Sequence, residues 1–133
     1  MNIHGIGTDV VEVARIAAAS EKLGPAFAAR FLTPAELEYC DAQATPAIHH
    51  AARFAAKEAV AKALGTGIGA DCGWQQIEIT RDATTGVPGV RLTGVAAAFA
   101  ARHGVTRVLV SLSHTRETAV AQALAVCEPD LPL

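Results

Sequence analysis

The charged residues between positions 53 and 69 are the first candidates for chemistry, because they crowd into a segment that is otherwise apolar. The helical period places Glu58 on a stripe with Phe54 and Ala61, so its carboxylate is expected to be partly buried. A desolvated carboxylate is costly unless a cation or a hydrogen-bond donor meets it. Lys62, one turn further on, is a candidate for that partner.

The alternative for Glu58 and Lys62 is an ordinary surface ion pair. A pair at this spacing stabilises a solvated helix by ~0.3–0.5 kcal/mol and requires no function. Taken alone, the local sequence favours this alternative.

Asp9 is a further candidate, since it follows a short apolar strand expected over residues 3–7. Strand ends often project side chains into clefts, but an aspartate in this position is more commonly a turn residue or a helix cap. His114 lies at the bend between two expected strands. It could be a surface turn residue or a ligand contact, and the sequence favours neither.

The glycines at positions 65, 67 and 69 follow a helix instead of preceding one. A dinucleotide-binding glycine loop precedes its helix, so that the positive end of the helix dipole meets phosphate. These glycines therefore predict a helix C-cap and a loop, which a ligand could approach closely.

The remaining pattern predicts elements that alternate between helix and strand. Phe27 and Phe31 are spaced as core anchors of a short helix, and a capping box at residues 33–36 starts the next one. Longer helices are expected over residues 11–23, 48–64 and 93–103. Two hairpins are expected, over residues 74–81 with 89–92 and over residues 105–113 with 117–126. Together these elements predict one α+β domain spanning residues 1–133.

The amino-acid composition limits the kinds of partner that the protein can bind. Apolar residues make up 51 % of the 133 residues, but aromatics only 5 %, and many of the apolar residues are alanine. So thin a core favours added burial by self-association. The net charge of −2 gives no basic field for nucleic acid, so an acidic partner would need a local patch. Arg15 and Lys22 form one cationic edge of the first long helix.

The cysteines and histidines show no metal-binding spacing. Cys40, Cys72 and Cys127 are far apart and are expected to be reduced thiols of a cytoplasmic protein. No histidine stands at a zinc-type spacing. No apolar run approaches the length of a membrane span, so we expect no membrane segment.

Four segments, in order and over nearly the whole chain, resemble the holo-[acyl-carrier-protein] synthase family, the short group of 4′-phosphopantetheinyl transferases. They are residues 5–13, residues 53–63 with the glycines that follow, residues 85–92, and residues 111–115. The resemblance implies transfer of the 4′-phosphopantetheine group of coenzyme A to a serine of apo acyl carrier protein, which releases adenosine 3′,5′-bisphosphate. It also implies a small antiparallel sheet packed by helices, in a homotrimer with the sites between protomers.

The same resemblance assigns residues to roles. Asp9 and Glu58 match the Mg²⁺-binding carboxylates, and Lys62 matches the lysine beside the pyrophosphate. The serine proton would go to a water held by the metal and Asp9, or to Glu58 itself. The nucleotide would meet Arg53, His114 and Thr115 at its 3′-phosphate end, and Thr66, Gly67, Gly86 and Pro88 in the loops around it. Arg15 and Lys22 would face the carrier protein.

Two departures from the family reduce fixed positive charge at the nucleotide end. Val87 stands where the family commonly has lysine, and His49 and His50 replace a more basic run. We therefore expect weaker or more pH-dependent coenzyme A binding than in a typical member. The competing interpretations are a non-catalytic coenzyme A or nucleotide-binding module on the same fold, and a structural trimer without a ligand.

Overall fold

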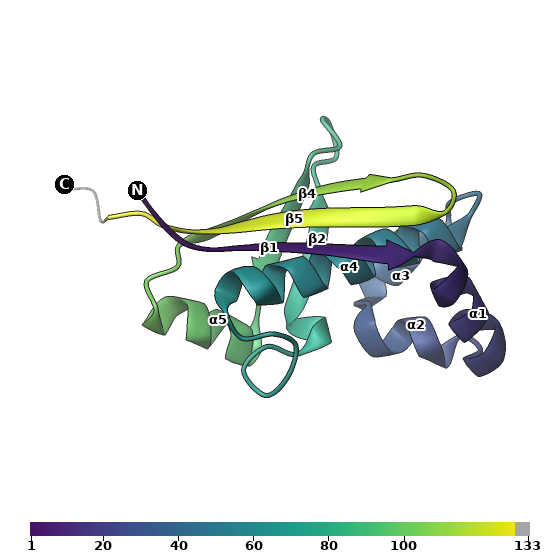
Figure 1. Cartoon of the computed structure of the whole chain (residues 1–133), viewed down its shortest axis with the longest axis horizontal. Coiled ribbons are helices and arrows are strands. Elements are labelled where there is room, and N and C mark those ends of the chain that lie inside the picture. The colour runs from purple at the N-terminus through teal and green to yellow at the C-terminus, as the bar shows by residue number, and fades with distance from the viewer. Residues whose placement is uncertain (130–133) are drawn as a thin grey trace.

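The computed structural model describes residues 1–129 and has a three-stranded antiparallel sheet with helices on one face (Figure 1). The strand order is β1-β5-β4, with β1 at Asn2–Glu12, β4 at Arg107–His114 and β5 at Thr118–Cys127. A separate hairpin pairs β2 (Ile77–Arg81) with β3 (Pro88–Leu92). The α+β class and both predicted hairpins are therefore confirmed.

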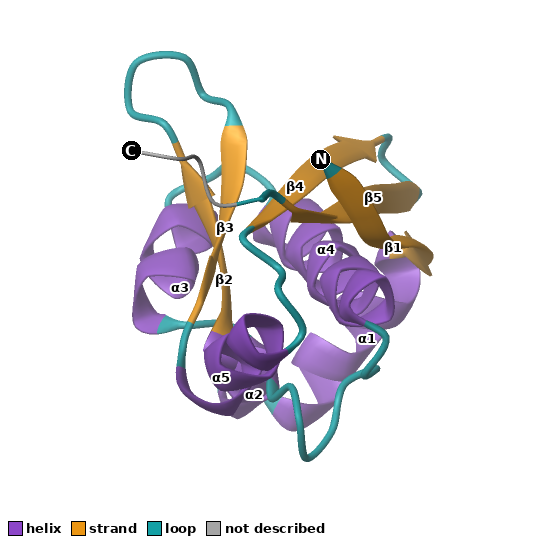
Figure 2. Cartoon of the chain, turned by 90° about the vertical axis from the view of Figure 1, so that its left-hand side faces the viewer, coloured by secondary structure: helices purple, strands orange, loops and turns teal. Residues whose placement is uncertain are grey.

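The longest helix, α4, lies directly against the inner face of β1 and β5 (Figure 2). It spans Pro46–Leu64 and ends at Gly65 in the left-handed conformation, as the sequence predicts. Two glycines of β1 allow the close approach. A Cβ on Gly5 would overlap the carbonyl oxygen of Ala63, and one on Gly7 would overlap that of Ala59. Small residues on both elements thus allow a thin core to pack closely.

The other helices surround this centre. They are α1 (Val13–Leu23), α2 (Ala26–Phe31), α3 (Pro34–Asp41), the short 3₁₀ helix η1 (Trp74–Gln76) and α5 (Gly94–Arg102). The predicted capping box opens α3: Thr33 Oγ1 accepts from the Glu36 N–H at 3.3 Å, and Glu36 Oε1 accepts from the Thr33 N–H at 2.7 Å. Phe31 is buried beside Phe27, Phe54 and Trp74, as expected of a core anchor.

Two boundary predictions are wrong in a way that matters for the site. Strand β1 continues to Glu12, and α1 begins only at Val13. Asp9 is therefore neither a turn residue nor a helix cap. It pairs in register with Ala121 in mid-strand, because β5 offers a hydrogen-bonding partner along the whole of β1.

The outer face of the sheet carries apolar side chains that no helix covers among residues 1–129 (Figure 1). We call these the outer sheet patch: Ile3, Ile6, Val10, Leu109 and Val120, which are 38 % to 74 % exposed.

The three cysteines are free thiols, as expected. Burial raises the pKa of Cys40 to about 11 and also raises that of Cys72, so both are inert structural thiols. A cytoplasmic location stays a prediction. No helix among the described residues has the length and apolarity to span a membrane.

Candidate functional site

Asp9 and Lys62 meet across the contact between β1 and α4. The Lys62 ammonium donates to Asp9 Oδ1 at 3.2 Å and to the carbonyl oxygen of Thr8 at 2.9 Å. Both side chains remain accessible, with 49 % of Lys62 and 19 % of Asp9 exposed. Within residues 1–129, Lys62 forms no ion pair with Glu58. The local interpretation of a surface i,i+4 pair is therefore wrong, because Lys62 reaches across to the strand instead of back along its own helix.

Glu58 lies beside this pair, half-buried at the edge of a cleft. Burial raises the pKa of its carboxyl group, the Asp9 carboxylate raises it further, and the Lys62 cation opposes both effects. The charges of Asp9 and Lys62 thus both act on the Glu58 carboxylate. The expected partial burial of Glu58 on a stripe with Phe54 is confirmed.

The cleft has a volume of about 680 Å³ and extends from the two carboxylates between β1, α1 and α4. Its walls include the carboxylates of Asp9 and Glu58, the cation of Arg15 and the apolar side chains of Ile16, Phe27 and Phe54. The cleft therefore combines negative oxygen ligands with an apolar surface. Such a cleft suits a long ligand with one charged end.

The two carboxylates fit a magnesium ion better than a transition metal. Among the described residues, no group of three or more His, Cys, Asp or Glu side chains could hold a metal. Mg²⁺ takes oxygen ligands and commonly uses only one or two protein carboxylates, with phosphate oxygens and water completing its shell. Asp9 and Glu58 on an open cleft meet that requirement, and a dedicated zinc site is not formed.

A second pocket, of about 210 Å³, gathers basic side chains from three elements. His49 and Arg53 come from α4, Arg81 from β2 and His114 from β4, with the backbone of Gly86 and Pro88 beside them. The pKa of His49 is lowered by burial first and then by the charges of Arg53, His114 and Arg81. This pocket is therefore locally positive in a protein of net charge −2.

Arg53 is the most constrained cation of this pocket. It is only 5 % exposed, its Nε atom has no hydrogen-bond partner, and its guanidinium carbon lies 4.4 Å from the centre of the Tyr39 ring. A buried cation without an acidic partner is costly unless an anion completes its surroundings. The pocket therefore favours an anionic ligand.

Besides Lys62, four predicted residues line neither cavity. Thr66 and Gly67 belong to the C-cap of α4, where both backbone N–H groups donate to the Ala61 carbonyl oxygen. Thr115 forms the bend between β4 and β5, where its hydroxyl accepts from the N–H groups of Glu117 and Thr118. Lys22 is exposed in the last turn of α1.

The predicted ligand-binding residues thus fall into two groups within one chain. The cleft with Asp9 and Glu58 shares no lining residue with the pocket of Arg53 and His114. Five helical positions separate Arg53 from Glu58, which corresponds to ~7.5 Å along the helix and ~140° around it. The structure brings Asp9, Glu58 and Lys62 together, and Arg53, Gly86, Pro88 and His114 together, but not the two groups.

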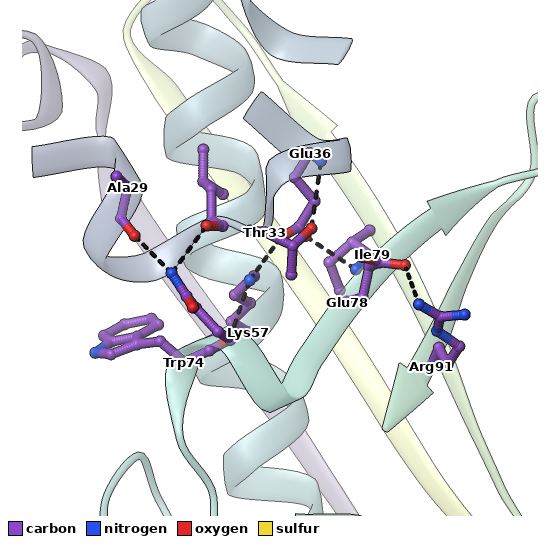
Figure 3. A network of polar contacts seen from close by, with 10 residues as sticks. Ala29, Thr33, Glu36, Lys57, Trp74, Glu78, Ile79 and Arg91 are labelled. Carbon is purple, nitrogen blue, oxygen red and sulfur yellow. Dashed lines mark hydrogen bonds and ion pairs between the residues drawn. The ribbon is translucent and has the colours of Figure 1, made fainter. Parts of the chain in front are cut away.

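Sequence reasoning missed a buried ion pair between α3 and α4 (Figure 3). Lys57 Nζ lies 2.7 Å from Glu36 Oε1, and neither side chain is more than 1 % exposed. Lys57 also donates to the Trp74 carbonyl oxygen, and Glu36 accepts from the Ile79 N–H (Figure 3). The signal was present, since Lys57 shares a helix face with Val60 and Leu64.

The sequence of the chain matches a known protein family. A sequence profile described as the 4′-phosphopantetheinyl transferase superfamily matches residues 5–124. The chain belongs to this superfamily. Within it, the chain is 53 % identical over 124 residues to the holo-[acyl-carrier-protein] synthase of Desulforudis audaxviator, covering 93 % of both proteins. It is 49 % identical over 119 residues to that of Chlorobaculum parvum, covering 90 % of this chain and 95 % of that one.

Solved structures of holo-[acyl-carrier-protein] synthases have the same fold. The Neisseria meningitidis enzyme superimposes with a TM-score of 0.88 at 40 % identity, covering 94 % of this chain and 99 % of that one. The Bacillus anthracis enzyme, in complex with coenzyme A (3′,5′-ADP), has a TM-score of 0.77 at 34 % identity, covering 95 % and 98 %. The Helicobacter pylori enzyme, in complex with coenzyme A, has a TM-score of 0.80 at 29 % identity, covering 91 % and 99 %.

Proposed function

We propose that this protein is a holo-[acyl-carrier-protein] synthase that transfers the 4′-phosphopantetheine group of coenzyme A to a serine of apo acyl carrier protein. The observation that carries the proposal is the cleft that Asp9 and Glu58 line. The Asp9 carboxylate helps to raise the pKa of Glu58, and Lys62 donates to Asp9. Attack on a pyrophosphate needs negative charge neutralised, a nucleophile positioned and a proton removed. These three side chains supply groups for all three tasks.

Asp9 and Glu58 would hold Mg²⁺, which supplies charge neutralisation at the pyrophosphate when it is bound. Lys62 is accessible enough to leave Asp9 and donate to a phosphate oxygen, where its charge stabilises the departing adenosine bisphosphate. Glu58 lies on the cleft that a serine hydroxyl must enter, so either Glu58 or a water held by the metal and Asp9 would accept the serine proton.

The pocket of Arg53 and His114 would receive the 3′-phosphate of coenzyme A. The support is the buried guanidinium of Arg53, which has no acidic partner within residues 1–129. A phosphate dianion offers the several acceptor oxygens that a guanidinium fork requires. Gly86 and Pro88 would form its backbone wall. Thr115 would lie at the same phosphate end, and Thr66 and Gly67 would supply loops around the nucleotide.

We also propose a homotrimer whose sites lie between protomers. Two observations support it: the residues for one ligand occupy two separate cavities of a single chain, and the outer sheet patch is apolar and uncovered. A neighbouring copy seated on the sheet would cover the patch and could place its Arg53 pocket beside the Glu58 cleft.

Mixing two inactive chains tests the shared site. Glu58→Gln and Arg53→Met impair different cavities, so co-refolded mixtures should regain part of the activity through interfaces that carry neither change. Light scattering should give three times the chain mass, and Ile6→Lys should lower it. Absence of any regained activity in a verified mixed oligomer would contradict the shared site.

Arg15 and Lys22 on α1 would attract the acidic carrier protein. Arg15 lines the cleft, and both side chains are exposed. The Michaelis constant for the carrier should therefore rise with ionic strength, because attraction between exposed charges is screened by salt.

The decisive experiment incubates the protein with coenzyme A, Mg²⁺ and an apo carrier protein and measures the carrier's mass. We expect the gain of one phosphopantetheine group, lost with a chelator and restored by Mg²⁺. Glu58→Gln should slow transfer at least ~100-fold without unfolding, whereas the exposed control Glu38→Gln should not. Coenzyme A binding without transfer to any carrier would instead favour the non-catalytic binding module.

A further inference from the structure

Arg81, the last residue of β2, shares the ring of Tyr39 with Arg53. The guanidinium carbon of Arg81 lies 5.0 Å from the ring centre and that of Arg53 lies 4.4 Å from it. Both distances are within the range of a cation–π interaction. The tyrosine ring thus orients two guanidinium groups whose like charges repel each other.

Arg53 and Arg81 also line the same two cavities. His114 borders the one of about 210 Å³, and Tyr39, Glu36 and Glu78 border the one of about 290 Å³. A Cβ added at Gly86 would come within 2.9 Å of Arg81 Nη2. The guanidinium group of Arg81 therefore lies along the Gly86 backbone, in the wall of the proposed phosphate pocket. A side chain at position 86 would require the guanidinium group of Arg81 to move.

The acidic residues around this pair are engaged elsewhere. Glu36 binds Lys57, Glu78 binds Arg91, Asp41 faces His50, and Asp82 accepts from the N–H groups of Thr84 and Thr85. In the described part of the chain, neither Arg53 nor Arg81 forms an ion pair. Among the described residues, no carboxylate lines the 210 Å³ pocket, which holds the buried guanidinium group of Arg53 and the exposed one of Arg81, so a dianion would complete this site.

We propose that Arg81 is a specificity-determining residue, which joins Arg53 in binding a terminal phosphate dianion and makes this protein discriminate coenzyme A from its analogue without the 3′-phosphate. The proposal rests on the proposed function for the identity of the donor substrate. Tyr39 is a positioning residue in it, since its ring holds both guanidinium groups. Arg81 also supplies a fixed positive charge near Val87, where the replacement of the family's lysine led us to expect too little positive charge.

The test compares coenzyme A with dephospho-coenzyme A as donors for the wild-type protein, Arg81→Gln and Arg81→Lys. The control is Arg91→Gln, which removes the same charge from the neighbouring strand, where Arg91 lies outside both cavities and is paired with Glu78. Arg81→Gln should raise the Michaelis constant for coenzyme A about tenfold, the effect of one charge-assisted contact. It should leave kcat for coenzyme A, and both kcat and the Michaelis constant for dephospho-coenzyme A, unchanged within about twofold. Arg81→Lys should restore part of the discrimination.

Calorimetry with adenosine 3′,5′-bisphosphate and adenosine 5′-phosphate gives a readout that does not require transfer. Arg81→Gln should weaken only the bisphosphate. Equal losses for both donors, or no loss for coenzyme A in an active protein, would overturn the role of Arg81 and leave the transferase function intact. Selective loss of bisphosphate binding in a protein that transfers nothing would support Arg81 and reject the function.

Discussion

Two lysines on α4, five positions apart, form ion pairs of opposite character. Lys57 is fully buried, 2.7 Å from Glu36, with a further bond to the Trp74 carbonyl oxygen. Lys62 is 49 % exposed, and its ammonium lies 3.2 Å from Asp9 Oδ1. The first pair connects α4 to α3 and η1, and Glu36 also accepts from the Ile79 N–H of β2. The second lies on an open cleft, where its members can exchange partners.

The difference teaches that pairing alone does not mark a functional cation. A buried pair is costly to break because each charge has lost its water, whereas an exposed pair can open at small cost. We therefore expect substitution of Lys57 to affect stability and substitution of Lys62 to affect chemistry. The following predictions test that division, from the largest effect to the smallest.

Lys57→Met should lower the free energy of unfolding by ~3–5 kcal/mol, because it leaves the Glu36 carboxylate buried without its cation. Denaturant titration would measure the loss. The double variant Glu36→Gln, Lys57→Met should recover part of it, since no charge then remains buried and the glutamine oxygen can still accept one backbone N–H. A loss below ~1 kcal/mol for the single variant would contradict a structural role for this pair.

Lys62→Met should slow phosphopantetheine transfer ~10²–10³-fold while changing the free energy of unfolding by less than ~1 kcal/mol. Its cation then no longer stabilises the charge that develops on the pyrophosphate. Steady-state kinetics and denaturant titration of the same preparation separate the two effects. Arg102→Met, an exposed cation of α5, is the control and should alter neither. A Lys62 variant that is unstable yet fully active would reverse the division between the two lysines.

Glu58→Gln should raise the melting temperature at neutral pH by at most a few degrees. The pKa of Glu58 is higher in the folded protein than its ordinary value of 4.5, mainly because of burial. The group therefore favours folding below pH 4.5 and loses that contribution as the pH rises through the folded-state pKa. The stabilisation by glutamine should thus be present at pH 7 and disappear near pH 4. If Glu58→Gln instead lowers the melting temperature at pH 7, the charged carboxylate does not destabilise the folded protein and the prediction is wrong.

The neighbours His49 and His50 extend the comparison. His49 lines the phosphate pocket, whereas His50 faces Asp41 in a different cavity. Burial lowers the pKa of both below the ordinary 6.5, and for His49 the charges of Arg53, His114 and Arg81 add to this. A bound dianion favours the protonated form of His49, so coenzyme A affinity should rise as the pH falls below ~6.5.

Calorimetry from pH 5.5 to pH 8 checks this expectation. His49→Gln should flatten the profile by about threefold at most, and His50→Gln should leave it unchanged. Equal effects of both substitutions on the pH profile would contradict a specific role of His49 in coenzyme A binding. The sequence suggested both histidines as the source of pH-dependent coenzyme A binding, and only His49 is now expected to contribute.

Much of the fold could be predicted because its signals are local. The capping box at Thr33, the glycine that ends α4 and the turn at residues 82–86 each specify their own conformation. The end of β1 could not be predicted locally. Thr8 to Glu12 remain extended because they pair with β5, more than a hundred residues later in the chain.

The candidate site divides in the same way. Asp9, Glu58 and Lys62 were found by the match of distant segments, and the structure places Asp9 and Glu58 on one cleft with Lys62 bonded to Asp9. Tyr39 and Arg81 carried no signal, because the approach of Arg81 to Arg53 depends on where the β2–β3 hairpin packs against α3 and α4.

By itself, the sequence determined the order of helices and strands, the helix face that carries Glu58, and the family to which the chain belongs. The first two depend on residue type and short-range spacing, and the family depends on the order of matching segments along the chain; folding alters none of these. Only the tertiary structure decided that Lys57 is buried and Lys62 accessible, that Lys62 meets Asp9 instead of Glu58, and that Arg81 joins Arg53 at one pocket. Those outcomes depend on which element covers each face of α4, and that is set by contacts between segments far apart in the chain.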